Sequence, residues 1–336
     1  MLGRLFRRDR PAPMPLDRDL AQDDLELRGA RDRALAGDWS AVRSLLAAPP
    51  SWEVQVRRVV VLGDAASGDG AWLRNWLTEF PEDAAAWAIE AERLSAAAGK
   101  ARGSRSADRT SEDQFQGFAG YSASAAQAAR RAIELAPDAP GPWNTLLGTM
   151  LSGFPGVQAE FATAYAEGLR RDPHNFDLHL SATTFYCEKW HGTHEQMFTV
   201  ARTAAANAPA GSTAAMLPVF AHFQFLLREH IWGSESVEDF NRRFVLCQEY
   251  MKTPTVLREV DDCVAKWRAG GAQKLGRTMT CRHWQALAYY LSDRDRLARP
   301  VHDEIGPYLG STPAWAHFGG EERTFQIARL CAQRAK

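Results

Sequence analysis

The sequence predicts an all-α protein. Valine and isoleucine are sparse beside alanine, leucine and arginine, and no stretch shows the period-two alternation of a half-buried strand. Apolar residues instead recur at helical spacing along most of the 336 residues. In addition, Pro137, Pro173 and Pro209 follow one another at intervals of 36 residues. This repeat predicts pairs of helices, with a proline at the end of each pair.

The residues around these prolines recur with them. A small residue lies five positions before each proline, and a ring lies six positions after the first two. The small residues are Ala132, Gly168 and Ala204, and the later positions hold Trp143, His179 and Ala215. A proline has no N–H to donate, so each should end the second helix of a unit. The small residue allows two helices to approach, and the ring fills the gap between units.

This pattern resembles the tetratricopeptide repeat, in which small and aromatic residues precede a proline and a tryptophan lies early on the next helix. The match is best in the unit ending at Pro137 and weakest at Pro209, where Ala215 replaces the ring. The spacing is 36 residues, against about 34 in the family. The stretch EKWHGTHEQMF also resembles an uncharacterised bacterial family of tetratricopeptide-like proteins of unknown function. The resemblance implies a right-handed helical-hairpin solenoid.

The N-terminal part is less regular. Residues 1–18 are rich in proline and arginine and are expected to be a disordered tail. Irregular hairpins should follow, with helices over residues 20–35, 40–48, 54–62 and 72–77. The stretch GDAASGDG, residues 63–70, has the glycines of a phosphate loop but lacks the Lys-Ser/Thr pair, so a turn is expected there.

An insertion separates Pro81 from Pro137. Residues 99–109, GKARGSRSADR, have almost no apolar content and predict a flexible loop. Ser111 and Gln114 then form a candidate capping box. The rings that follow at three-residue spacing predict a short helix packed against the stack; they are Phe115, Phe118 and Tyr121.

The chain therefore divides into three parts: the tail, tetratricopeptide-like helical repeats over 19–232, and a divergent helical region over 233–336 that continues or caps the stack. In the last part, Thr253-Pro254 and Thr312-Pro313 are helix-start signals, because proline is favoured at the first helical position.

The composition excludes several classes of protein. A net charge of -1 argues against nucleic acid as the main partner, since phosphate binding needs clustered basic residues. No run of about eighteen apolar residues predicts a transmembrane helix, and no signal-peptide core is evident. The five cysteines are dispersed, with no CxxC, as in cytoplasmic proteins with reduced thiols.

One polar cluster could carry chemistry. Cys187, His191 and His194 lie within FYCEKWHGTHEQMF and are residue types that bind zinc. A helix end, a glycine turn and a new helix are expected within these residues, so the side chains should diverge, and no fourth ligand is evident. We interpret the stretch as a structural elbow and expect no metal, no cofactor and no catalytic residue.

The function that this pattern favours is a non-enzymatic scaffold that binds a peptide or a partner protein in a concave groove. By analogy with tetratricopeptide proteins, the first helix of each unit lines that groove. Counting from the ring positions gives the candidate binding residues Glu92, Asn144, Thr184, Met216 and Phe220, with Ala88 beside Glu92. No feature indicates a particular oligomeric state.

Two alternatives remain open. One is an enzyme, or a binder of a small molecule or metal, with a pocket between the repeats and the C-terminal helices. Histidine is dense between residues 174 and 230, and the candidate residues are His191, His194, His222, His230 and His283. The other is a purely structural subunit of an assembly.

Overall fold

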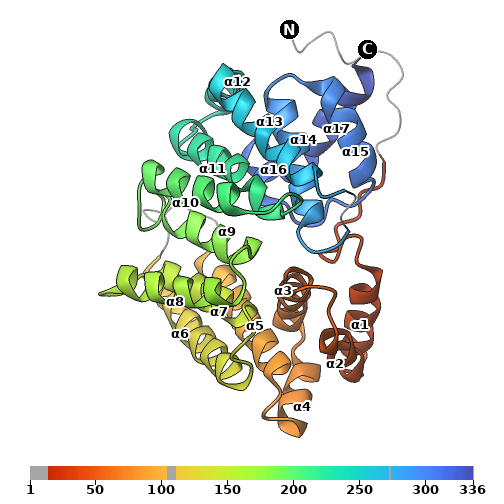
Figure 1. Cartoon of the computed structure of the whole chain (residues 1–336), viewed down its shortest axis with the longest axis vertical. Helices are drawn as coiled ribbons and strands as arrows, with labels where there is room; N and C mark the ends of the chain where they lie inside the picture. The colour runs from red at the N-terminus through yellow and green to blue at the C-terminus, as the bar shows by residue number, and fades with distance from the viewer. Residues whose placement is uncertain (1–13, 104–110, 272–273, 336) are drawn as a thin grey trace.

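A computed structural model describes residues 14–103, 111–271 and 274–335. These residues form helices and connecting loops and contain no strand; the one isolated bridge joins Asp17 and Tyr308. The all-α prediction is confirmed. In Figure 1, successive helices lie side by side, and α9 lies between a lower group, α3 to α8, and an upper group, α10 to α17.

The helices of the first part are α1 (Leu25–Leu35), α2 (Ser40–Ala47), α3 (Trp52–Gly68), α4 (Ala71–Glu79), α5 (Ala84–Arg102), α6 (Glu112–Leu135), α7 (Gly141–Thr149), η3 (Met150–Ser152), α8 (Val157–Arg171), α9 (Phe176–Phe185) and α10 (His194–Asn207). Those of the second part are η4 (Thr213–Met216), α11 (Leu217–Leu226), η5 (Leu227–Ile231), α12 (Val237–Met251), α13 (Pro254–Arg268), α14 (Thr278–Leu291), α15 (Asp295–Ile305), α16 (Pro313–His317) and α17 (Glu321–Arg334). None of these helices has the length and apolar character needed to cross a membrane.

The repeated prolines lie where the sequence predicts them. Each is two residues beyond the end of a helix, and these helices are α4, α6, α8 and α10. The position six residues later is the third or fourth residue of the next helix, and it holds Trp87, Trp143, His179 and Ala215. The expectation that proline ends the helix and the ring lies one turn into its successor is confirmed.

The ring has a hydrogen-bonding role that packing alone does not explain. Nε1 of Trp87 donates to the carbonyl oxygen of Pro81 at 2.8 Å, and Nε2 of His179 lies 2.9 Å from the carbonyl oxygen of Pro173. Because a carbonyl only accepts, Nε2 of His179 carries the proton and its Nδ1 accepts from the Tyr165 hydroxyl at 2.5 Å. Burial lowers the pKa of His179, which favours this neutral form.

The unit at Pro137 uses a different donor. There the Arg171 guanidinium donates to the Pro137 carbonyl and lies 4.6 Å from the centre of the Trp143 ring. The proline carbonyl is therefore paired in all three units, by the ring in two of them and by Arg171 in the third, where Nε1 of Trp143 has no hydrogen-bond partner among the described residues.

Close helix packing explains the small residues. A Cβ on Gly168 would lie 2.8 Å from Cδ2 of Leu178, and a Cβ on Gly63 would lie 2.4 Å from Cβ of Glu92. The second contact shows why the turn predicted at GDAASGDG is wrong over residues 63–68. These residues continue α3, because Gly63 lets α3 approach α5 more closely than any side chain would permit.

The insertion also differs from prediction. Residues 99–102 form the last turn of α5, which ends at Gly103 with φ of 70°, and residues 104–110 lie outside the described part. The Ser111–Gln114 capping box is confirmed. The helix that it begins is long, however, and Phe115 and Tyr121 are 39% and 44% exposed. Phe118 is half-buried, so the prediction is wrong for the other two rings, because α6 pairs with α5 through small residues such as Gly117, facing Ala101.

The N-terminal tail is ordered where it is described. Asp17 donates its backbone N–H to Pro307 at 2.8 Å and accepts from Leu309 at 2.9 Å and Gly310 at 3.0 Å. The prediction of disorder over residues 14–18 is therefore wrong, because these extended residues find backbone partners in the loop before α16; residues 1–13 lie outside the described part. The first and last parts of the fold thus lie side by side.

The close approach at Gly63 gives a stability test. We expect Gly63→Ala to destabilise the fold by about 1–3 kcal/mol, because the added methyl group overpacks the α3–α5 contact. Gly29→Ala, in a helix and with nothing within 4 Å of the added Cβ, is the control. It should leave the protein as stable or up to about 1 kcal/mol more stable. Urea unfolding followed by circular dichroism measures both, and equal stabilities would contradict the role of Gly63 in packing.

Candidate functional site

Five ionisable residues from four parts of the chain meet inside the fold. Glu53 and Arg57 come from α3, Glu92 from α5 and Asp177 from the first turn of α9, and Arg277 directly precedes α14. Each interacts electrostatically with at least one other member. We call these residues the inner charged cluster.

An ion pair forms the centre of this cluster. The Arg277 guanidinium donates through Nη2 to Oδ1 of Asp177, and the two side chains are only 13% and 3% exposed. Oδ2 of Asp177 and Nε of Arg277 have no hydrogen-bond partner among the described residues. Removing two charges from water is costly, so the pair depends on close geometry and on the rest of the cluster.

Glu53 joins α3 to the start of α14. Its Oε1 accepts from the backbone N–H of Arg277 at 2.8 Å, and its Oε2 accepts from the Thr213 hydroxyl. A Cβ on Gly276, whose φ is 56°, would lie 2.5 Å from Oε1, so this loop needs glycine. Burial raises the pKa of Glu53, and the hydrogen bonds from Thr213 and Arg277 oppose that rise.

Glu92 also has one carboxylate oxygen without a hydrogen-bond partner in the described part of the chain. Its Oε1 accepts from the Thr145 hydroxyl at 2.5 Å, and no hydrogen bond from the described residues reaches its Oε2. Burial, with the nearby Asp177 carboxylate adding to it, raises the pKa of Glu92. Arg57 donates to the carbonyl of Leu20, and burial lowers its pKa. A guanidinium still keeps its charge, so Arg57 is a cation held away from water.

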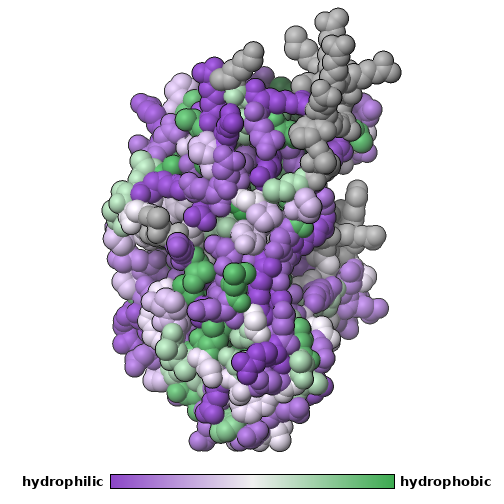
Figure 2. Space-filling view, turned by 90° about the vertical axis from the view of Figure 1, so that its right-hand side faces the viewer, coloured by the Kyte–Doolittle hydropathy of each residue, from purple (hydrophilic) through white to green (hydrophobic). Residues whose placement is uncertain are grey.

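Glu92 also lines a pocket of about 170 Å³ between α2, α3, α5 and α7. Most of its walls are apolar, and the lining includes Leu46, Val56, Val59, Ala88, Glu92 and Thr145. A cavity of about 150 Å³ holds a benzene ring, so this one has room for a single aromatic group. On the side of the molecule that carries α1, α2 and α3, apolar residues interrupt the polar surface (Figure 2).

Only one of the five predicted groove residues lines this pocket, namely Glu92. Oδ1 of Asn144 accepts from Ser181 at 2.8 Å and so links α7 to α9. The Thr184 hydroxyl donates within its own helix, to the carbonyl of Leu180 at 2.8 Å.

The two predicted groove residues in the last unit are covered. Met216 is fully buried, and Phe220 stacks on Trp284 with 5.1 Å between ring centres. Trp284 belongs to α14, so the C-terminal helices lie over the face that these residues were expected to expose. The tetratricopeptide analogy carries no information about this added layer.

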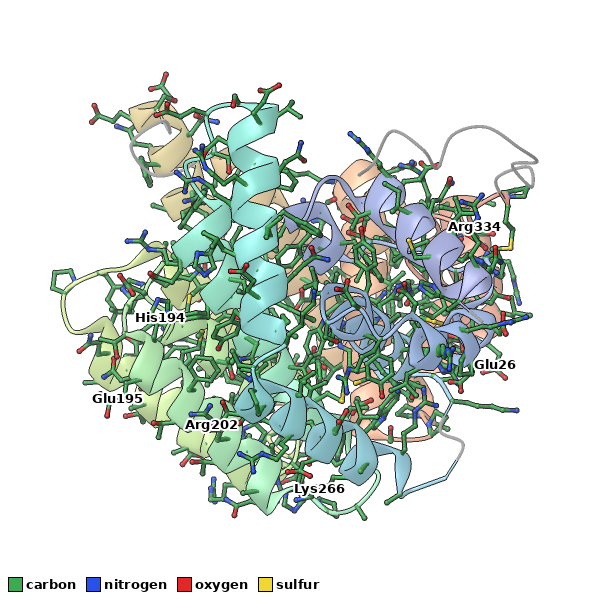
Figure 3. All side chains as sticks on the ribbon, turned by 90° about the horizontal axis from the view of Figure 1, so that it is seen from above. Glu26, His194, Glu195, Arg202, Lys266 and Arg334 are labelled. Carbon is green, nitrogen blue, oxygen red and sulfur yellow. The ribbon has the colours of Figure 1, made fainter. Side chains whose placement is uncertain are left out.

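The structure does not bring the five candidate histidines together. His191 bonds the Leu151 carbonyl, and His230 packs against Phe225. His222 bonds Tyr250 and Glu259, and His283 bonds the Tyr308 carbonyl and accepts from Trp315. Burial lowers the pKa of His283 to about 4, so it is a neutral core residue. His194 lies at an outer edge of the molecule, near Glu195 and Arg202 (Figure 3), and contacts Glu188 and Glu229.

The remaining cluster members were not predicted, although Asp177 lies two residues before the ring position of its unit. Arg277 is 100 residues away from Asp177, in the region without a repeat. No local pattern links such residues; a charged residue in the first turn of an otherwise apolar helix is the only signal the sequence offers.

No protein-family model matches this chain, and no curated protein matches it either.

The central ion pair predicts a large stability effect. Arg277→Met should cost about 3–5 kcal/mol of unfolding free energy, because it leaves the Asp177 carboxylate buried without a partner. Arg130→Met is the control, because its pair with Glu160 is half exposed and its loss should cost at most about 1 kcal/mol. Adding Asp177→Leu to Arg277→Met should recover most of the loss in urea unfolding. If Arg277→Met alone were as stable as the native chain, the ion pair would not be needed for stability.

The raised pKa of Glu92 predicts a pH dependence. A carboxyl group whose pKa rises on folding stabilises the fold while protonated, and that contribution is lost as the pH increases through the raised pKa. The stability of Glu92→Gln relative to the native chain should therefore grow as the pH increases above the ordinary value of 4.5. Glu82→Gln, at a carboxyl group that is 82% exposed, is the control and should show little change. A pH-independent difference for Glu92→Gln would contradict this assignment.

Proposed function

We propose that this chain is a non-enzymatic helical scaffold that binds a partner protein through a short segment, one side chain of which enters the pocket between α2, α3, α5 and α7. The observation that carries the proposal is the unshared Oε2 of Glu92 in the wall of an otherwise apolar pocket. This oxygen has no partner within the described part of the protein and is not fully buried, so a ligand in the pocket can donate a hydrogen bond to it.

The shape and chemistry of the pocket indicate the side chain that fits. Val56, Val59 and Ala88 offer an apolar surface for a ring, and Glu92 offers an acceptor at its edge. Tryptophan and tyrosine combine a flat apolar body with one N–H or O–H donor. A partner segment with one of these residues would bury the ring and satisfy Glu92 together.

The tetratricopeptide-like solenoid is part of this proposal. It is supported by the prolines that end α4, α6, α8 and α10, and by the donors that pair the carbonyls of three of those prolines. In such proteins the first helix of a unit faces the groove, and Ala88 and Glu92 lie on the first helix of theirs. A reducing, cytoplasmic location is also proposed, because the five cysteines are unpaired.

The rival proposal of a histidine-containing pocket has less support. His194 and His230 contact the same ring, Phe225, and His222 contacts Tyr250 beside it. His191 and His283 bond backbone carbonyls elsewhere. Groups that act on one substrate have to converge, and these five histidines do not.

A displayed library of random peptides, selected against the purified full chain, tests the proposal. Selected peptides should carry tryptophan or tyrosine, and fluorescence anisotropy with labelled peptides should show saturable binding. Ala88→Phe fills the pocket and should weaken binding by about tenfold or more, as the loss of one buried ring does. Ala159→Phe, at an exposed position on α8, is the control and should bind as the native chain does. Failure to select any peptide, or equal binding by Ala88→Phe, would refute the proposal.

A further inference from the structure

A second polar group lies away from the pocket. Glu188 follows α9, His194 is the first residue of α10, and Glu229 lies in η5. Nε2 of His194 is 2.9 Å from Oε1 of Glu229 and 3.0 Å from Oε2 of Glu188. In the described part of the chain, this is the one set of three potential metal ligands whose donor atoms all lie within 4.8 Å of one another.

Within this group, negative charge is in excess, because two carboxylates face one imidazole. A neutral imidazole has at most one proton on Nε2, so it can donate a full hydrogen bond to only one of the two carboxylates. Arg228 contributes a positive charge at one side, where its Nη2 is 3.4 Å from Oε1 of Glu188. A divalent ion would attract both carboxylates and accept the lone pair of a deprotonated Nε2.

The surrounding backbone holds the three side chains in place. The Thr193 side chain caps α10 and so fixes where His194 begins the helix. A Cβ on Gly192 would lie 2.3 Å from the Tyr186 carbonyl oxygen, so the turn that carries Glu188 is tightly folded. Glu229 lies in a π-helical segment, a geometry that is rare and is frequent at functional sites.

A small cavity lies beside two of the three residues. Glu188 and His194 line it together with Lys189, Arg228 and mainly apolar residues, Glu229 lies outside its lining, and its volume is about 10 Å³. This is roughly the volume that one water molecule needs, which also suits one bound ion or a water bound to it. The sequence groups His194 with Cys187 and His191 as possible ligands, but His191 is engaged by the Leu151 carbonyl.

We propose that Glu188, His194 and Glu229 bind one divalent transition-metal ion. One imidazole nitrogen and two carboxylate oxygens suit Zn²⁺ in a site that leaves a coordination position for water. The proposal is independent of the peptide-binding pocket, because none of the three residues lines that pocket. His194 lies at an outer edge of the molecule (Figure 3).

Calorimetric titration of the metal-free full chain with ZnCl₂ tests this proposal. We expect one ion bound per chain, and His194→Ala and Glu229→Gln should each weaken binding by at least about tenfold, the scale seen even for indirect supporting residues. Glu195→Gln removes a carboxylate next to His194 that is outside the set, and it should bind Zn²⁺ as the native chain does. Equal binding by all four proteins, or no binding at millimolar Zn²⁺, would overturn the proposal and leave a simple ion pair.

Two further measurements identify the ligands and separate misfolding from ligand loss. Co²⁺ should bind with visible bands of nitrogen and oxygen ligation, whereas intense near-ultraviolet bands from thiolate ligands would assign the ion to a cysteine and overturn the proposal. In thermal unfolding, Zn²⁺ should raise the Tm of the native chain and of Glu195→Gln but not that of a folded His194→Ala. A Tm rise of equal size in His194→Ala would also overturn it.

Discussion

The buried ion pair between Asp177 and Arg277 is the constraint on which the rest of the architecture depends. Asp177 lies in the first turn of α9, in the last unit that keeps a ring after its proline, and Arg277 directly precedes α14, in the region without a repeat. A buried carboxylate and a buried guanidinium are tolerated only together. This requirement fixes the C-terminal helices against the repeat, and Glu53 extends the same connection to α3.

That arrangement also explains where binding can occur. In the later units, α14 places Trp284 against Phe220, and Met216 is fully buried, so the two groove residues predicted there are covered. Between α2, α3, α5 and α7, the carboxyl group of Glu92 lines a mainly apolar pocket. The cluster that joins the C-terminal helices to α9 therefore also supplies a carboxylate oxygen to the wall of this pocket.

The sequence predicts features that depend on residues within one or two helical turns, but it does not predict contacts between residues that are distant in the chain. The four prolines, the small residues before them and the capping box at Ser111 act within one or two turns, so spacing alone predicts them. The continuation of α3 through Gly63 depends on contact with α5, and the ordered Asp17 depends on a loop almost 300 residues later. The same limit applies to the site: Glu92 follows from the repeat, whereas Asp177, Arg277 and the Glu229 contact of His194 depend on the tertiary fold.

Backbone hydrogen exchange followed by mass spectrometry can show whether the charged cluster joins the two parts of the fold, because it reports which segments open together. The start of α14 should exchange at the same slow rate as α3 and α9, as one cooperative unit connected through Asp177, Arg277 and Glu53. Rapid exchange of α14 while α3 and α9 stay protected would be the opposite result, and would mean that the buried charges do not hold the two parts together.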